Sequence, residues 1–294
     1  LKTTIIMIFI KFFKERKIED LLISILIFLF PISIVSGPFF PDFIVTSFSL
    51  IFIFKLFYDR DFFYYLKKKH SVKIFFFLTF YLIVILSLLN SNKFSLSFYP
   101  SFFYFRFILF TLIILYFLES NKKLILLFTY SLILVFFILS IDSILQLFLG
   151  KNIFLQSSAE PSMTTINRIH SELNIITSFF GDEKKLGSFV SRFLPMLIAL
   201  IIFLGKSHFD KFKIKELLII LSTIMIIVST ERIAILYLFI FFIFYFFTLN
   251  KTNKIFTTII FIFLIIFSSI LLKDYITKFY DSTYNQIYEK EKII

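Results

Sequence analysis

The stretch TSFFGDEKKLGSFVSRFLP, residues 177–195, interrupts an apolar chain with a charged turn and then places an arginine inside the next apolar run. Glycine and short polar residues favour turns and helix ends, so this turn predicts the start of a helix. Arg192 would lie about one and a half turns inside that helix. The stretch therefore predicts a helix that begins at a polar surface and carries a charge into apolar surroundings.

Composition identifies those surroundings. Of the 294 residues, 59% are hydrophobic, and the mean hydropathy is +0.93. A soluble domain of this length could not bury so much apolar surface. Apolar runs of about 18 residues recur, which is the length that spans a hydrocarbon core of about 30 Å, and they lack the alternation of strands. The sequence therefore predicts an all-α integral membrane protein in contact with a lipid bilayer.

The apolar runs predict a polytopic membrane helix bundle with about nine transmembrane helices in a single transmembrane domain, residues 1–294. We find no internal repeat and no linker that would divide this bundle. The predicted spans are residues 21–37, 42–57, 74–90, 102–118, 124–149, 186–204, 216–229, 233–249 and 255–272.

Basic residues predict which side of the membrane each loop faces. The segments on one side hold 18 lysines and arginines, and the segments on the other side hold 10 spread over more residues. The basic set is 1–20, 58–73, 119–123, 205–215 and 250–254. By the positive-inside rule the N-terminus is cytoplasmic. Loop 150–185 and the segment 273–294, the start of a large external loop, then face the outside.

Composition disfavours two kinds of site. The chain has no cysteine, so it has neither disulfides nor thiolate metal ligands. No metal-ligand cluster is visible, and we expect neither a metal nor a cofactor. The net charge of +12 could suggest a nucleic-acid partner. Most of the basic residues, however, fall in short loops between the predicted spans, and we expect no nucleic-acid binding.

Four of the six arginines lie on the predicted outer side: Arg106, Arg168, Arg192 and Arg232. A charge at membrane depth costs about 2.5–3.5 kcal/mol on insertion scales and usually faces a bundle interior or an aqueous cavity. The planar guanidinium fork matches phosphate and carboxylate geometry. Each arginine could instead snorkel to the interface or pair with a nearby acid. Their shared side favours a common anion site.

The start of the helix predicted at 186–204 adds to this anion site. Lys185, Ser188 and Arg192 recur at i, i+3 and i+7 and so share one face. Helix N-termini attract phosphates, and we predict Asp182 as the N-cap. Gly187 would also allow a second helix to approach closely. We therefore assign diphosphate binding to Lys185 and the four arginines, and glycan binding or orientation to Ser188.

Three further polar residues lie near the same predicted side. Asp142 and Gln146 are one turn apart near the end of the fifth span. One alternative is an interfacial polar face or a hydrogen bond between helices, and the other is the binding of sugar hydroxyls or the orientation of an arginine; both stay open. We expect Glu231 to position Arg232 rather than to act as a base.

Four stretches resemble the bacterial O-antigen ligase and O-antigen polymerase family. They are SGPFFPD (36–42), IDSILQLFLGKNIF (141–154), SFFGDEKKLGSFVSRFLP (178–195) and STERIAI (229–235). The order and spacing of these stretches carry the resemblance more than any one motif does. It covers about the first three-quarters of a typical member of this family.

The resemblance implies a glycosyltransferase of the bacterial inner membrane, with residue 294 in the periplasm. Such enzymes transfer a glycan from undecaprenyl diphosphate to lipid A-core or to a growing polysaccharide. They resemble metal-independent inverting glycosyltransferases, in which arginines hold the diphosphate. A histidine of a large external loop activates the acceptor in this family. That histidine is expected beyond Ile294, so the catalytic residue is unknown and the chain is expected to be truncated at its C-terminus.

The sequence departs from the family where an arginine usually precedes the central motif, because residues 174–178 read NIITS. His70 and His208 fall in predicted cytoplasmic loops, and we interpret His170 as a surface residue. Two alternatives remain open from the sequence. One is a transporter or flippase for the same lipid-linked glycan, although the inverted symmetry typical of transporters is not visible. The other is an inactive fragment.

Overall fold

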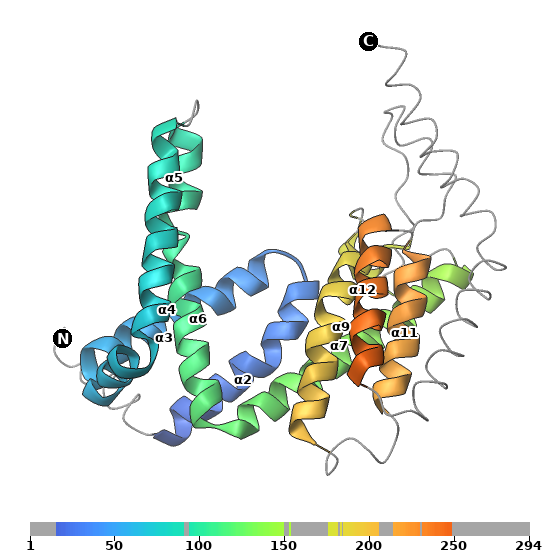
Figure 1. Ribbon diagram of the computed structural model, residues 1–294, viewed down its shortest axis with the longest axis horizontal. Coiled ribbons are helices and arrows are strands. Elements are labelled where there is room, and N and C mark those ends of the chain that lie inside the picture. The colour runs from blue at the N-terminus through green and yellow to red at the C-terminus, as the bar shows by residue number, and fades with distance from the viewer. Residues whose placement is uncertain are drawn as a thin grey trace. The chain divides into compact units, whose positions relative to one another are not determined.

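A computed structural model describes residues 16–90, 94–149, 153, 176–181, 183, 185–205, 214–229 and 231–248 (Figure 1). Over these residues the chain forms helices and turns, and no strand. The predicted all-α class is therefore confirmed for the part of the chain that the structure describes.

Five helical stretches in the described ranges are long and apolar enough to cross a membrane. They are Phe39–Tyr58, Arg60–Asn90, Phe94–Ser120, Lys122–Leu149 and Leu186–Leu204. Each contains one predicted span in full, and Arg60–Asn90 and Phe94–Ser120 begin 14 and 8 residues before the predicted starts at 74 and 102. These lengths and compositions are those of an integral membrane protein.

Three further predicted spans coincide with helices that do not meet the same measure of length and apolarity. The helix α12 has an apolar part, Ile233–Phe247, that is shorter than a full span. The helices concerned are α2 (Arg16–Val35), α11 (Ile214–Val228) and α12 (Arg232–Thr248). The ninth predicted span, 255–272, lies outside the described residues. The count of nine stays a prediction.

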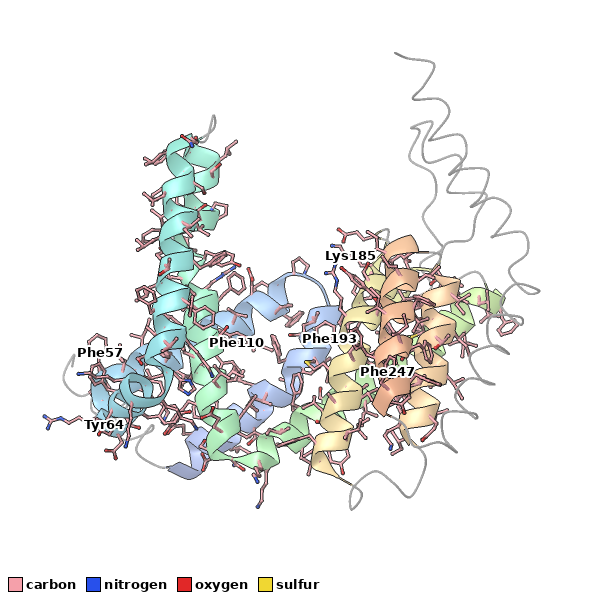
Figure 2. The ribbon with its side chains drawn as sticks, in the orientation of Figure 1. Phe57, Tyr64, Phe110, Lys185, Phe193 and Phe247 are labelled. Atoms are coloured by element: carbon pink, nitrogen blue, oxygen red, sulfur yellow. The ribbon has the colours of Figure 1, made fainter. Side chains whose placement is uncertain are left out.

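The chain divides into two compact units, Leu1–Phe128 and Thr129–Ile294. The first contains α2, α3 (Phe39–Tyr58), α4 (Arg60–Ser87), η1 (Leu88–Asn90), α5 (Phe94–Phe102) and α6 (Phe105–Ser120). In it α3 packs against α2, α4 and α6 around fully buried Phe48, Phe62 and Ile113. Phe110, labelled in Figure 2, places its ring centroid 5.2 Å from that of Phe30 and 5.6 Å from that of Phe48.

The segment 58–73 was predicted as a loop, but its residues 60–73 belong to α4. Asp59 takes an extended conformation, and its Oδ1 accepts hydrogen bonds from the backbone N–H groups of Asp61 and Phe62, both at 3.1 Å. This is the geometry of an N-cap, and it starts α4 at Arg60. The lysines of this segment indicated only its orientation, and the cap by Asp59 was not predicted.

The second unit begins within α7 (Lys122–Leu149), whose last part belongs to it. It continues through the 3₁₀ turn η2 (Ser178–Phe180), α9 (Leu186–Leu204), α11 and α12. The helix α9 packs against both α11 and α12, and these three helices lie side by side in Figure 1. Its buried face includes Leu186, Val190, Leu194 and Leu197 at 1% exposure or less. The helix α9 is therefore the centre of this unit.

Gly187 sets how closely the start of α9 approaches the turn between α11 and α12. A Cβ atom built on Gly187 would lie 2.3 Å from Ser229 Oγ, 3.0 Å from Ala234 Cβ and 3.2 Å from Glu231 Cβ. Contacts this short require the helix and the turn to separate. The predicted role of Gly187 in close helix approach is confirmed.

Replacing Gly187 with alanine should destabilise the second unit by about 1–3 kcal/mol, the usual cost of overpacking. The free energy of unfolding can be measured by SDS titration in mixed micelles. Ala199→Val is the matched control, because it adds volume at an exposed position of the same helix. Equal stability of Gly187→Ala and the parent chain would contradict the close approach.

Candidate functional site

The predicted polar residues of the second unit whose side chains the structure describes lie around the start of α9. Four pieces meet there: the last turns of α7, the turn 176–181, the first turns of α9 and the turn between α11 and α12. The ring centroids of Phe180 and Phe189 lie 5.6 Å apart, and those of Phe189 and Phe136 of α7 lie 6.4 Å apart. These contacts tie the turn to both helices.

Asp142 holds two points of the chain that are far apart in sequence. Its carboxylate is fully buried in α7. One oxygen accepts a hydrogen bond from the Ile153 backbone N–H at 2.7 Å, and the other accepts from the Ser178 hydroxyl at 2.5 Å. The two ends of the segment between residues 153 and 178 therefore meet at a single buried carboxylate.

Gln146, one turn further along α7, completes the attachment of the turn 176–181. Its Oε1 accepts from the backbone N–H groups of Thr177 at 3.1 Å and Ser178 at 2.8 Å. Ser178 is fully buried and has φ +53°, a left-handed conformation that costs a non-glycine residue about 1–2 kcal/mol. The bonds to Asp142 and Gln146 offset that strain.

These contacts bear on the two alternatives for Asp142 and Gln146. The described oxygens of both side chains are bound to the chain's own amides and hydroxyl, and both side chains are 3% exposed or less. The geometry favours a positioning role over direct contact with a sugar. The hydrogen-bond partners of Asp142 and Gln146, however, are in residues 153, 177 and 178 and not in a neighbouring helix.

Replacing Gln146 with leucine should leave the amides of Thr177 and Ser178 buried without an acceptor. An unsatisfied buried group costs about 1–3 kcal/mol. We expect a loss of stability of this size and faster hydrogen exchange at both amides, measured by mass spectrometry. Ser143→Ala is the control, because the Ser143 hydroxyl bonds only to the Leu139 carbonyl of its own helix among the described partners. Unchanged exchange in Gln146→Leu would refute the attachment.

Glu231 occupies the N-terminus of α9. One of its carboxylate oxygens accepts from the Gly187 backbone N–H at 2.7 Å. The other accepts from the Ser188 backbone N–H at 2.9 Å and from the Ser188 hydroxyl. A carboxylate at this position satisfies exposed amides and interacts favourably with the helix dipole. The cap of α9 is therefore supplied by a residue 44 positions away in sequence.

One expectation is corrected by this cap. The helix begins at Leu186 with Lys185 at the N-cap position, so the prediction of Asp182 as N-cap is wrong. The described contacts of Glu231 run to Gly187 and Ser188, and its positioning of Arg232 stays a prediction because the Arg232 side chain lies outside the description. Ser188 lies beside a carboxylate of the chain, so the amides at this helix start are already bound to an anion.

Glu231→Ala should remove the acceptor from two amides and one hydroxyl at the start of α9. Hydrogen bonds to a charged group contribute about 1.5–3 kcal/mol each, and we expect the free energy of unfolding to fall by about that amount or more. Glu231→Gln keeps one acceptor oxygen and should recover part of the loss. An alanine variant as stable as the parent chain would contradict the capping role.

The basic residues of this site differ in their surroundings. Arg192 is exposed on α9, and no described carboxylate forms an ion pair with it. Lys185 is exposed at the start of α9, where Figure 2 labels it, and it pairs with Glu183. Of the predicted diphosphate-binding residues in this unit, Arg192 is the one whose described side chain is left without an acidic partner.

Arg106 belongs to the first unit and has an acidic partner there. Its Nη2 lies 2.9 Å from Asp42 Oδ2, and its guanidinium lies 5.1 Å from the ring centroid of Phe107. The backbone carbonyl of Arg106 accepts a hydrogen bond from Ser49 at 2.8 Å, which joins α6 to α3. Asp42 was not predicted as the partner of Arg106, although this acid lies in the SGPFFPD stretch on the same predicted side.

The remaining predicted residues are only partly described. Arg168 and His170 lie outside the described residues, as do most of loop 150–185 and all of 273–294. Arg232 begins α12, and its side chain is outside the description. Among the predicted site residues, the structure brings Glu231 into direct contact with Ser188, and it links Asp142 to Gln146 through Ser178.

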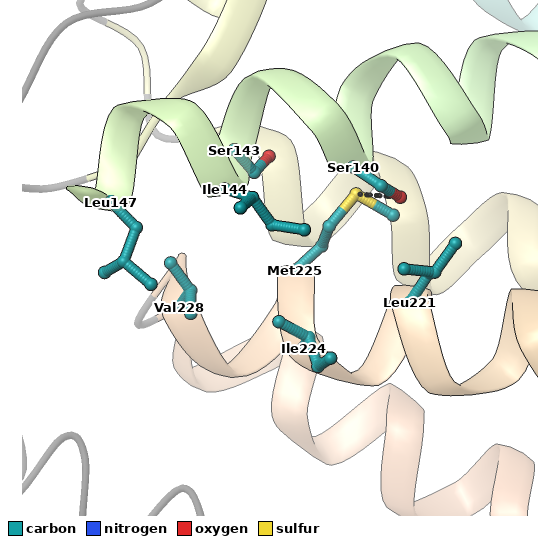
Figure 3. A pocket seen from close by; sticks show the side chains of 8 residues that line it. All are labelled: Ser140, Ser143, Ile144, Leu147, Leu221, Ile224, Met225 and Val228. Atoms are coloured by element: carbon teal, nitrogen blue, oxygen red, sulfur yellow. Dashed lines mark hydrogen bonds between the residues drawn. The ribbon is translucent and has the colours of Figure 1, made fainter. Parts of the chain in front are cut away.

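A hollow between α7 and α11 lies beside this site (Figure 3). Its lining is almost wholly apolar, and Ser140 donates a hydrogen bond to Met225 Sδ at 3.5 Å across it. The lining residues are Ser140, Ser143, Ile144, Leu147, Leu221, Ile224, Met225 and Val228. None of them is charged, so this hollow cannot hold a diphosphate.

Comparisons with known proteins do not assign this chain to a family. No family model, curated protein or solved structure matches this chain. Within the described ranges, no group of three or more histidine, aspartate or glutamate side chains could hold a metal ion. The site is a hydrogen-bonded frame around the start of one apolar helix, with an exposed arginine about one turn further along it.

Proposed function

We propose that this chain is an integral membrane glycosyltransferase of the O-antigen ligase or polymerase type. It would transfer a glycan from undecaprenyl diphosphate to lipid A-core or to a growing polysaccharide. The observation that carries the proposal is Arg192, an exposed guanidinium on an apolar helix with no acidic partner among the described residues. A charge kept in such a place usually serves a ligand or an aqueous path.

The frame around α9 supports this proposal, because it fixes where Arg192 lies. Asp142 and Gln146 hold the turn before α9, and Glu231 holds its first amides. With the helix backbone at Arg192 held in place, only the arginine side chain has to be ordered when it binds a phosphate. Preorganised charge of this kind is the largest contribution in many enzymes that stabilise a developing anion.

The chemistry of the proposed reaction makes a fixed cation useful. The bond between the sugar anomeric carbon and the phosphate oxygen breaks as the acceptor hydroxyl attacks from the opposite face. The electron pair of the broken bond remains on the diphosphate, which gains negative charge, and the hydroxyl proton passes to a base. Arg192 would bind the leaving oxygen with its two-pronged donors. Arginine would thereby supply the charge that metal ions supply in other phosphate-transfer sites.

The proposal includes a topology. Nine spans with a cytoplasmic N-terminus would place the start of α9 and the turn between α11 and α12 at the outer face of the bacterial inner membrane. Arg168 and Arg232 belong to the same predicted face, as does Arg106 at the start of α6. A diphosphate carried on a lipid would reach these residues from the outer leaflet.

Replacing Arg192 with lysine should lower the rate of glycan transfer by about 10²–10³, the usual effect of losing one preorganised donor. Lysine keeps the charge but cannot bind with a planar fork. The rate would be measured in membranes that contain the full chain, an undecaprenyl-diphosphate-linked glycan and lipid A-core, with protein insertion checked by fractionation.

Arg60→Lys is the matched control, because Arg60 is exposed in α4 and lies on the predicted cytoplasmic side. It should leave transfer unchanged. Normal transfer in Arg192→Lys would remove Arg192 from the site. Movement of the lipid-linked glycan across the membrane without any transfer would instead favour the transporter.

A further inference from the structure

The first turns of α4 and the turn between α6 and α7 form a basic surface on the first unit. Every lysine in both places is exposed. The basic surface consists of Lys67, Lys68, Lys69, Lys73, Lys122 and Lys123. Its charge lies at the end of apolar helices, which is a different part of the molecule from the start of α9.

Glu119 brings the two groups of lysines together. Lys69 Nζ lies 2.5 Å from Glu119 Oε2, and Tyr65 donates a hydrogen bond to the same oxygen. Glu119 is near the end of α6 and three residues before Lys122. One of the six lysines is thus paired, and the other five form no ion pair with any residue that the structure describes.

A buried histidine fixes this end of α4 against α6. His70 is 2% exposed, and its Nε2 lies 2.9 Å from the Tyr65 hydroxyl. Because Tyr65 donates its proton to Glu119, the Tyr65 oxygen must accept from His70 Nε2–H. Hydrogen bonds from His70 through Tyr65 to Glu119 therefore hold α4 against α6. The backbone positions of the lysines on α4 do not depend on a ligand.

The length of α4 places Lys67, Lys68 and Lys69 of the basic surface outside the hydrocarbon. The continuous helical stretch Arg60–Asn90 has 31 residues, or about 46 Å at 1.5 Å per residue. A hydrocarbon core measures about 30 Å, so about ten residues must project beyond it. The lysines and Asp61 lie at the Arg60 end and the far end is apolar, so the projecting part is the one that carries Lys67–Lys69.

Exposed aromatic side chains border the lysines at the junction of α3 and α4. Phe57 is 77% exposed and Tyr64 is 64% exposed, and both lie at the same end of the first unit in Figure 2. Lys68 Nζ lies 5.9 Å from the ring centroid of Tyr64. Aromatic rings beside basic residues are typical of the zone where a membrane meets water.

We propose that the basic surface binds the headgroups of anionic phospholipids in the leaflet that α4 enters. Basic clusters directly outside a membrane helix attract such lipids. Lysine suits this role, since a point charge on a flexible stem accommodates mobile headgroups without a fixed geometry. The lysines lie at the end of a membrane helix and beside exposed aromatic rings, which is the depth of the lipid headgroups. This location favours a lipid over a nucleic acid as the ligand. The inference does not depend on the proposed glycosyltransferase activity.

The test measures how strongly the full chain prefers an anionic lipid. The chain is reconstituted in phosphatidylcholine bilayers, and spin-labelled phosphatidylglycerol and phosphatidylcholine report their relative association by electron paramagnetic resonance. Lys67→Gln/Lys68→Gln/Lys73→Gln should lower the preference for phosphatidylglycerol by at least about five-fold, which is the contribution of a single lysine charge near the surface. The matched control, the same three positions changed to arginine, should keep the preference.

Salt provides a second measurement that needs no variant. Raising the ionic strength to 1 M reduces the Debye length to about 3 Å, and the preference of the parent chain should fall toward one. A preference that survives both salt and the glutamine triple variant would overturn the proposal. Loss of the preference in the arginine control would overturn it as well. A parent chain that shows no lipid preference but binds an RNA oligonucleotide would assign the surface to nucleic acid.

Discussion

Backbone amides in turns and in the first turn of a helix have no acceptor within the helix, so in an apolar molecule other parts of the chain must supply one. This constraint determines the structure of the second unit. Water is absent from a hydrocarbon core, and an unsatisfied amide there costs several kcal/mol. Asp142, Gln146 and Glu231 supply acceptors to five such amides, those of residues 153, 177, 178, 187 and 188. Three side chains thereby determine where the turn before α9 lies and where α9 begins.

The same contacts change how the anion site should be understood. A helix N-terminus is a natural site for a phosphate, and the charged turn before α9 suggested one. In the structure a carboxylate of the chain already occupies that position. Two anions at one helix start would repel each other, so a diphosphate would be expected further along α9, near Arg192. The helix start is then part of the scaffold, and the exposed guanidinium is the group left to meet a ligand.

Helical class and most span positions could be predicted from the sequence, because hydropathy over about 18 residues is a strong signal in a chain this apolar. The start of α4 was missed, since lysines at 67–69 obscured a cap that depends on Asp59 alone. Gly187 was understood correctly from its spacing and size. The contacts of Asp142 with Ser178 and of Glu231 with Gly187 could not be predicted, because these partners lie 36 and 44 residues away and no local pattern encodes such a distance.

The cap that Glu231 places on α9 has a consequence for biosynthesis. Ser188 leaves the ribosome 43 residues before the carboxylate that binds it. During that interval α9 and α11 have been made, yet two amides at the start of α9 still lack their final acceptor. Those amides have no such acceptor until Glu231, the residue directly before α12, has been made. The final placement of the α9 start therefore depends on a residue that is synthesised after both α9 and α11.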